Sequence, residues 1–91
     1  MGMYATYYSD ICNKPSCVYW LYDIAGALLY VGLTTNPLGR VSQHRSKQPW
    51  GKQIDDYYVE WYPNREEAKS AEREAIARDN PLHNMTRPAV L

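Results

Sequence analysis

The stretch CVYWLYDIAGALLYVG, residues 17–32, consists of two runs of aliphatic and aromatic residues with a short polar segment between them. Runs of this composition are typical of β-strands, and we expect strands over 18–23 and 27–33. The connecting segment 23–26 has Asp in its first position and Gly in its fourth, as type I turns prefer. The stretch therefore predicts an antiparallel β-hairpin.

Two tyrosines occupy matching places in the predicted hairpin. Counting outward from the turn places Tyr19 directly opposite Tyr30, and opposed residues project from the same side of a sheet. Gly32 leaves the backbone bare on that side, where a ligand could approach closely. The two hydroxyls would then lie close together. The alternative is an ordinary cross-strand pair that only stabilises the hairpin.

A helix is expected directly after the hairpin. Asn36 is a favourable N-cap residue and Pro37 suits the first helical position, so the helix begins there and continues to about Lys47. The breaker Pro-Trp-Gly at 49–51 ends it.

Charge is unevenly distributed along the chain. The segment 40–52 of this neutral chain holds four basic residues and no acid: Arg40, Arg45, Lys47 and Lys52.

The first helix also carries a candidate phosphate-binding pair. Arg40 and His44 are four residues apart and share one helix face. A guanidinium matches the geometry of phosphate oxygens, so the pair suits a phosphate ligand. A basic face that is simply solvated is the alternative.

A third strand over 57–62 and a second helix complete the expected elements. The helix starts at Asn64 with Glu67 as its capping-box partner, and it ends near Asp79, before Pro81. The order β-β-α-β-α predicts an α+β domain with a small antiparallel sheet and helices packed on it.

The second helix places a carboxylate among its apolar residues. Glu72 lies four residues after Ala68 and four before Ile76, inside the stripe that Ala71 and Ala75 complete. An inward carboxylate is costly unless a metal ion or an arginine pairs with it. A structural ion pair is the alternative to a functional role. Asn84, beyond the helix, either follows a simple termination or folds back as a hydrogen-bonding group.

Length and composition indicate one globular domain, because 45% of the 91 residues are apolar and no repeat or linker interrupts them. We expect an irregular lead-in over 1–16, the domain over 17–84 and a tail over 85–91.

No apolar run approaches the ~20 residues that span a bilayer, and the N-terminus does not resemble a secretory signal. We therefore expect a cytoplasmic protein without a membrane partner, whose Cys12 and Cys17 remain thiols without zinc.

These residues together resemble the GIY-YIG nuclease domain. The resemblance covers 17–84 and rests on Val18-Tyr19, then Tyr30-Val31-Gly32, and on a later series in the family's order and spacing: Arg40, His44, Glu72, Ile76, Pro81 and Asn84. Two departures stand out. Cys17 replaces the first Gly of the family motif, and Val replaces Ile in both triplets.

The resemblance implies a three-stranded antiparallel sheet flanked by helices and a metal-dependent endonuclease that hydrolyses phosphodiester bonds. It implies that Tyr19 is the general base, with Tyr30 positioning water and phosphate. Arg40 would neutralise charge on the phosphate, and His44 would orient Tyr19 or the phosphate. Glu72 would be the protein ligand of one Mg²⁺ or Mn²⁺ ion. A free phenol has a pKa of ~10, so Tyr19 either ionises beside positive charge or relays a proton through His44.

DNA is the expected partner, and Gly32, Arg45, Lys47 and Asn84 are the expected substrate-binding residues. A neutral domain of this size should bind weakly, so we also expect a homodimer or a targeting protein. The strand aromatics could stack on unpaired bases or simply pack in the strand: Tyr57, Tyr58, Trp61 and Tyr62. The rival functional hypothesis is an inactive nucleic-acid-binding module. A purely structural domain is a third, which leaves Glu72 without a role.

Overall fold

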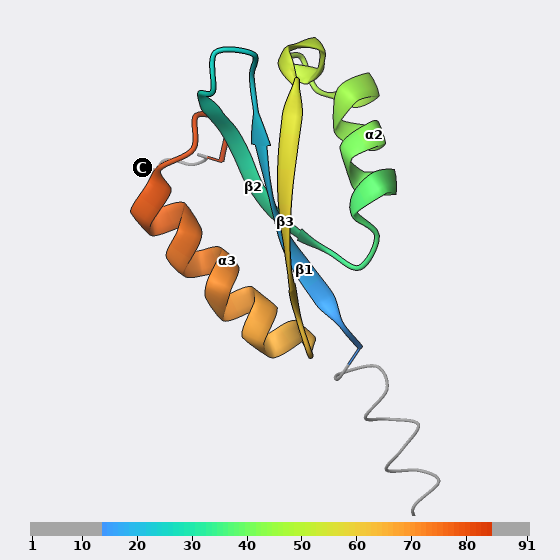
Figure 1. Cartoon of the computed structure of the whole chain (residues 1–91), viewed down its shortest axis with the longest axis vertical. Helices are drawn as coiled ribbons and strands as arrows, with labels where there is room; N and C mark the ends of the chain where they lie inside the picture. The colour runs from blue at the N-terminus through green and yellow to red at the C-terminus, as the bar shows by residue number, and fades with distance from the viewer. Residues whose placement is uncertain (1–13, 85–91) are drawn as a thin grey trace, which may run out of the picture.

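The computed structural model describes residues 14–84 and has the expected α+β architecture, with a three-stranded antiparallel sheet and two α-helices (Figure 1). Segments 1–13 and 85–91, which include most of the expected lead-in and tail, lie outside the described residues. The elements in chain order are β1 (Ser16–Tyr22), β2 (Leu28–Thr34), α2 (Pro37–Lys47), η1 (Gly51–Gln53), β3 (Asp56–Tyr62) and α3 (Arg65–Asp79).

The first strand is the centre of the sheet, whose order is β2-β1-β3. Helix α2 covers one face and α3 the other (Figure 1). Every residue of β1 except Tyr22 is buried, which explains why this strand is apolar at nearly every position rather than at alternate ones. The two faces of the sheet therefore belong to two separate cores.

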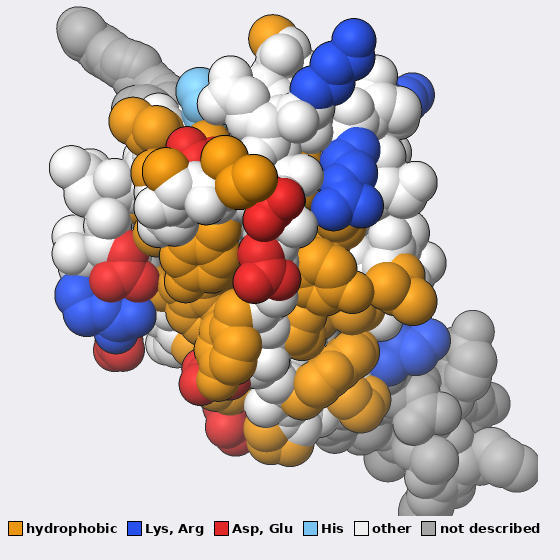
Figure 2. Space-filling view, turned by 45° about the horizontal axis from the view of Figure 1, so that its top comes forward, with side chains coloured by type: hydrophobic (Ala, Val, Ile, Leu, Met, Phe, Trp, Pro, Cys, Tyr) orange, Lys and Arg blue, Asp and Glu red, His pale blue; other side chains and the backbone are white. Residues whose placement is uncertain are grey.

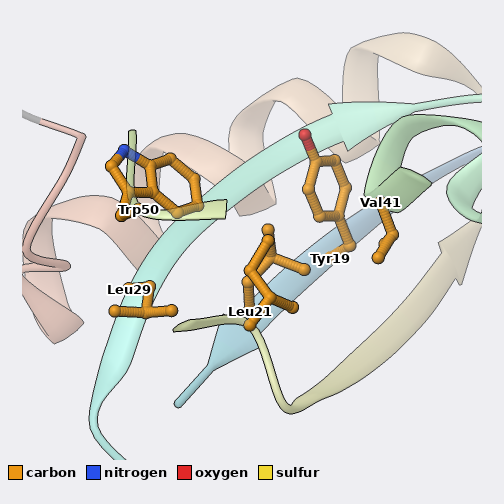
Figure 3. Packing of buried hydrophobic residues seen from close by; sticks show 6 residues of the cluster. Tyr19, Leu21, Leu29, Val41 and Trp50 are labelled. Atoms are coloured by element: carbon orange, nitrogen blue, oxygen red, sulfur yellow. The ribbon is translucent and has the colours of Figure 1, made fainter. Parts of the chain in front are cut away.

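The core beneath α2 contains side chains from both hairpin strands and from the segment after α2 (Figure 3). Tyr19 and Leu21 from β1 pack there with Leu29 from β2, together with Val41 and Trp50. Because Tyr19 is only 1% exposed, the ring is a core residue as well as a candidate catalytic group.

The core beneath α3 confirms the predicted apolar stripe. Ala68 and Ala75 are buried against Val18 and Trp20 of β1, and Ala71 and Ile76 pack against the same cluster. The small alanine side chains let the helix backbone approach the sheet closely. The stripe thus positions the face of α3 on which Glu72 lies.

The predicted turn is confirmed, but the predicted register of the hairpin is wrong. Gly26 N donates to Asp23 O at 2.9 Å, as in the expected turn. Tyr22, however, pairs with Leu28 rather than with residue 27, and a bulge then shifts the register by one more residue. Beyond the bulge the total shift is two residues, so Tyr30 and Gly32 stay on their predicted side of the sheet. Leu28 and Leu29, before the bulge, lie on the sides opposite to those predicted, because Leu29 packs with Leu21 and Leu28 packs with the cluster of Trp20.

Asn36 and Asn64 cap the starts of the two helices as the sequence predicts. The Asn36 side chain accepts a hydrogen bond from Gly39 N, and the Asn64 side chain accepts one from Glu67 N. Asn80 ends α3 in the left-handed conformation with φ of 51°. Within residues 14–84, no helix is both long and apolar enough to span a bilayer.

Cys17, which stands where the family motif has glycine, is fully buried in β1 as a free thiol. Its backbone pairs with β2 on one side and with β3 on the other, so the position is ordinary extended strand. Burial raises the pKa of the thiol, which makes it unreactive. Cys12 lies outside the described residues.

Candidate active site

A hydrogen bond between Tyr19 and His44 lies at the centre of the candidate site. Tyr19 Oη and His44 Nε2 are 2.8 Å apart, and both side chains are buried. Tyr19 comes from the central strand and His44 from α2, whose inward residues are Val41 and His44. Helix packing therefore brings together two groups that are 25 residues apart in the sequence.

Tyr30 joins this pair even though it does not lie directly opposite Tyr19. Its partner on β1 is Leu21, which places it diagonally from Tyr19 on the same face. The ring centroid of Tyr30 lies 6.1 Å from that of Tyr19 and 4.7 Å from that of His44. We call these three residues the aromatic triad. The expectation that both tyrosines face one point is confirmed, although the direct pair is not.

Gly32 is the true cross-strand partner of Tyr19. A Cβ atom at Gly32 would overlap the end of the Tyr19 ring, including its hydroxyl oxygen. The space that we expected to admit a ligand is therefore occupied by Tyr19, whose hydroxyl end lies over β2 (Figure 3). The absent side chain is what allows the phenol to reach His44.

Substituting Gly32 by alanine should displace the Tyr19 ring and break the Tyr19–His44 hydrogen bond. Overpacking of this kind costs about 1–3 kcal/mol, so thermal unfolding should shift to lower temperature. The matched control is Gly26→Ala, whose Cβ meets no neighbouring atom but whose φ of 88° strains an alanine. Both variants should lose stability, and only the Gly32 variant should change the NMR signals of His44. Unchanged His44 signals in Gly32→Ala would contradict this assignment.

Burial dominates the electrostatics of the triad. It raises the pKa of Tyr19, and the nearby Tyr30 adds to the increase, while the charge and hydrogen bond of Arg40 oppose it. It also raises the pKa of Tyr30 and lowers that of His44, where the charge of Arg40 acts in the same direction. Burial therefore disfavours the charged form of both the phenol and the imidazole, and the charge of Arg40 opposes this effect at Tyr19.

Arg40 on α2 and Glu72 on α3 act electrostatically on the tyrosines of the aromatic triad. The positive charge of Arg40 lowers the pKa of Tyr19 and of Tyr30, and the negative charge of Glu72 raises both. Arg40 is exposed, whereas Glu72 is half-buried. The two charges therefore act on the same pair of phenols.

Glu72 suits a divalent cation that keeps most of its water. Burial raises the pKa of its carboxyl group, and in the described part of the chain this group makes no hydrogen bond or salt bridge. No group of three or more His, Cys, Asp and Glu residues within 14–84 could form a closed metal cage. Mg²⁺ is commonly held by one or two carboxylates, with water and phosphate oxygens as its other ligands. The residues present therefore fit an open magnesium or manganese site.

Asn84 lies against the edge strand β2, at the residue that follows Tyr30. Its side chain accepts from Val31 N at 2.7 Å and donates to Val31 O at 2.8 Å. The preceding residues continue this contact, since Leu82 N donates to Leu28 O and His83 N donates to Leu29 O. Asn84 does fold back, as one of the two alternatives proposed, and it holds the part of β2 between Tyr30 and Gly32.

The remaining expected substrate-binding residues, Arg45 and Lys47, are exposed in the last turn of α2. They lie on the same helix as Arg40 and His44, with their side chains in solvent. Their placement leaves them available to a polyanion, and no contact ties them to the aromatic triad.

The aromatic residues of β3 lie on a surface that also carries acidic groups (Figure 2). Tyr58 and Trp61 are each more than half exposed, but the hydroxyls of Tyr58 and Tyr62 both donate to Glu60. The adjacent hollow beside Tyr62 is lined by further carboxylates: Glu66, Glu67 and Glu74. Negative charge repels a phosphate backbone, so this surface favours the packing interpretation over base stacking.

Two residues close to the triad are absent from the sequence-based site. Trp50 stacks on His44 and is 8% exposed, and His83 stacks on Trp50. In the sequence, Trp50 is part of the helix-breaking Pro-Trp-Gly and His83 is one residue of a terminal loop. Neither position has a periodicity or a motif that indicates a site, so only the fold could place them.

The fold and the site together define a small α+β domain with a Tyr–His pair between an arginine on one helix and a carboxylate on the other. The chain belongs to the GIY-YIG catalytic domain family, whose family model matches residues 15–86 of its 91 residues. This is a family of nucleases. None of the curated proteins compared with the chain matches it significantly.

Proposed function

We propose that this protein is a divalent-metal-dependent endonuclease that hydrolyses phosphodiester bonds in DNA. The observation that carries the proposal is the buried hydrogen bond between Tyr19 and His44, with Arg40 and Glu72 acting on it from opposite helices. A binding module or a structural domain has no need for a half-buried carboxylate that lacks a hydrogen-bond partner within residues 14–84.

Tyr19 would activate the attacking water through His44. The phenolic oxygen accepts a proton from water while its own proton passes to His44 Nε2, so the water oxygen attacks phosphorus without a free phenolate being formed. Burial supports this route, because it disfavours the charged form of each group on its own. The bond to the leaving oxygen breaks as the new P–O bond forms, and His44 finishes as the imidazolium.

The flanking residues would bind the phosphate and its charge. The guanidinium of Arg40 would donate to the nonbridging oxygens, where charge grows in the transition state. Tyr30 would position the water and the phosphate beside Tyr19. Glu72 would hold one Mg²⁺ or Mn²⁺ ion, which when bound would supply positive charge to stabilise the leaving oxygen.

The exposed basic residues of α2 would extend the contact along the DNA backbone. Arg45 and Lys47 are the candidates, and a contact with so few phosphates gives weak binding that decreases as salt rises. A homodimer or a targeting protein would supply the missing affinity and specificity.

A cleavage assay tests the proposed function directly. Plasmid DNA and single-stranded DNA are incubated with the protein in Mg²⁺ or Mn²⁺, with and without EDTA. We expect metal-dependent cleavage that EDTA abolishes and that Arg40→Ala strongly reduces. Cleavage that persists in EDTA would contradict the metal-dependent mechanism. DNA binding without cleavage by the wild-type protein would support the rival hypothesis of an inactive binding module.

A further inference from the structure

The indole ring of Trp50 stacks on two imidazole rings. Its centroid is 5.4 Å from that of His44 with an interplanar angle of 26°, and 4.8 Å from that of His83 with an angle of 3°. Both Trp50 and His44 are more than nine-tenths buried, whereas His83 is exposed. The three rings form a column that leads from the candidate site to the surface.

Local structure fixes Trp50 firmly beside the end of α2. Gly51 N donates to Gln48 O at 2.9 Å, and Gln53 N donates to Trp50 O at 3.0 Å. A Cβ atom at Gly51 would overlap the carbonyl oxygens of His44 and Arg45, so only glycine permits this close approach. The tryptophan is therefore held against the same helical turn that carries His44.

The outer side of the column is fixed by a different part of the chain. His83 N donates to Leu29 O, and Asn84 pairs with Val31 through both of its side-chain amide atoms. These bonds hold the segment after α3 along β2, which places the His83 ring against Trp50. Trp50 is thus enclosed by elements that lie more than 30 residues apart in sequence.

The column determines how His44 can be oriented. A hydrogen bond joins the imidazole Nε2 to Tyr19 Oη, and one bond does not prevent a ring from tilting. The rings of Trp50 and Tyr30 pack against the imidazole, at interplanar angles of 26° and 53°. The titratable or charged groups that act on His44 directly are Tyr19, Tyr30 and Arg40, and His83 lies beyond the indole.

We propose that Trp50 is a positioning residue, whose indole ring, backed by His83, holds the His44 imidazole in the orientation that presents Nε2 to Tyr19. Its effect on catalysis rests on the proposed function, because Trp50 acts through His44 and touches no reacting atom. Its effect on His44 itself does not depend on nuclease activity.

The test compares two variants. Trp50→Leu keeps an apolar side chain but removes the aromatic ring, whereas Trp50→Phe keeps a smaller aromatic ring. The titration of His44 is followed by NMR, and the pH dependence of cleavage is measured in parallel. In Trp50→Leu we expect the pKa of His44 to rise towards its ordinary value, because water reaches the ring. Cleavage requires neutral His44, so its decline towards acid pH should move to higher pH by the same amount.

The expected size of the rate loss and the control variants make the test specific to Trp50. Misplaced catalytic groups lose on the order of 10²-fold in rate, and we expect a loss of this order in kcat for Trp50→Leu with little change in KM. Trp50→Phe should remain close to wild type. Trp61→Leu removes an exposed tryptophan and should change neither measurement. His83→Ala alters only the surface end of the column and should shift the His44 pKa in the same direction by a smaller amount.

An unchanged His44 pKa in both Trp50→Leu and His83→Ala would overturn the proposal. A shifted pKa with unchanged kcat would overturn the catalytic part of it. If the wild-type protein cleaves no DNA, the proposed function fails, and the NMR titration alone decides whether Trp50 positions His44. If Trp50→Leu does not fold, the His44 titration in His83→Ala decides: a raised pKa of His44 supports the proposal and an unchanged pKa overturns it.

Discussion

Replacing Tyr19 by phenylalanine is expected to lower the rate of DNA cleavage by roughly 10²–10⁴-fold, the usual contribution of a positioned acid or base. The substitution removes only the hydroxyl that joins His44 at 2.8 Å. The ring, which is part of the core under α2, stays in place. The lost activity would therefore report on the proton path and not on the packing.

The Tyr19→Phe variant should also be less stable by about 1–3 kcal/mol, because it leaves a buried imidazole nitrogen without its partner. Thermal unfolding and single-turnover cleavage measure the two effects separately. Tyr62→Phe is the matched control, since that hydroxyl donates to Glu60 on the outer strand. Wild-type cleavage by Tyr19→Phe would mean that Tyr30 or His44 takes the proton from water directly.

Replacing Glu72 by glutamine is expected to abolish metal-dependent cleavage while the protein remains folded. Glutamine has the same shape but no charge, so it removes the proposed ligand of the divalent ion and leaves the packing of α3 intact. Binding of Mn²⁺, followed by electron paramagnetic resonance, should be lost together with cleavage. Glu74→Gln, an exposed position on the same helix, should retain both properties.

The pH dependence of stability gives a second test of Glu72. Burial raises the pKa of this carboxyl group in the folded state, so the folded protein binds the proton more tightly than the unfolded chain does. The stability that the protonated form contributes is present below the unfolded-state pKa and is lost as pH rises through the folded-state pKa. Glu72→Gln should lack this decline and be at least as stable as wild type at pH 7.

For the cleavage experiment, metal-dependent cleavage that survives in Glu72→Gln would exclude Glu72 as the metal ligand.

Features that depend on neighbouring residues could be predicted from the sequence. The turn at 23–26, the caps at Asn36 and Asn64 and the apolar stripe of α3 follow from local backbone preferences and from helical periodicity. The α+β class and the position of Glu72 on the inner side of α3 follow from the same signals. Family resemblance then assigned roles to residues that periodicity alone could only mark as unusual.

The hairpin register shows where local preference ends. The pairing of Tyr22 with Leu28 and the bulge next to Tyr22 each shift the register by one residue, so that Gly32, and not Tyr30, is the partner of Tyr19. The bulge places Leu29 and Tyr30 against the same core, which is an outcome of packing under α2. For the two tyrosines the side of the sheet was predictable because side chains alternate with a period of two, but the cross-strand partner was not.

The sequence by itself determined the elements, their order and the charged and phenolic groups of the site, since these follow from periodicity, capping residues and motif spacing. Only the tertiary structure decided that Tyr19 meets His44 above Gly32, that burial disfavours the charged form of both groups, and that Trp50, with His83 stacked on it, packs against the imidazole. Those features arise from contacts between segments far apart in the chain and from exclusion of water, which no local pattern of residues encodes.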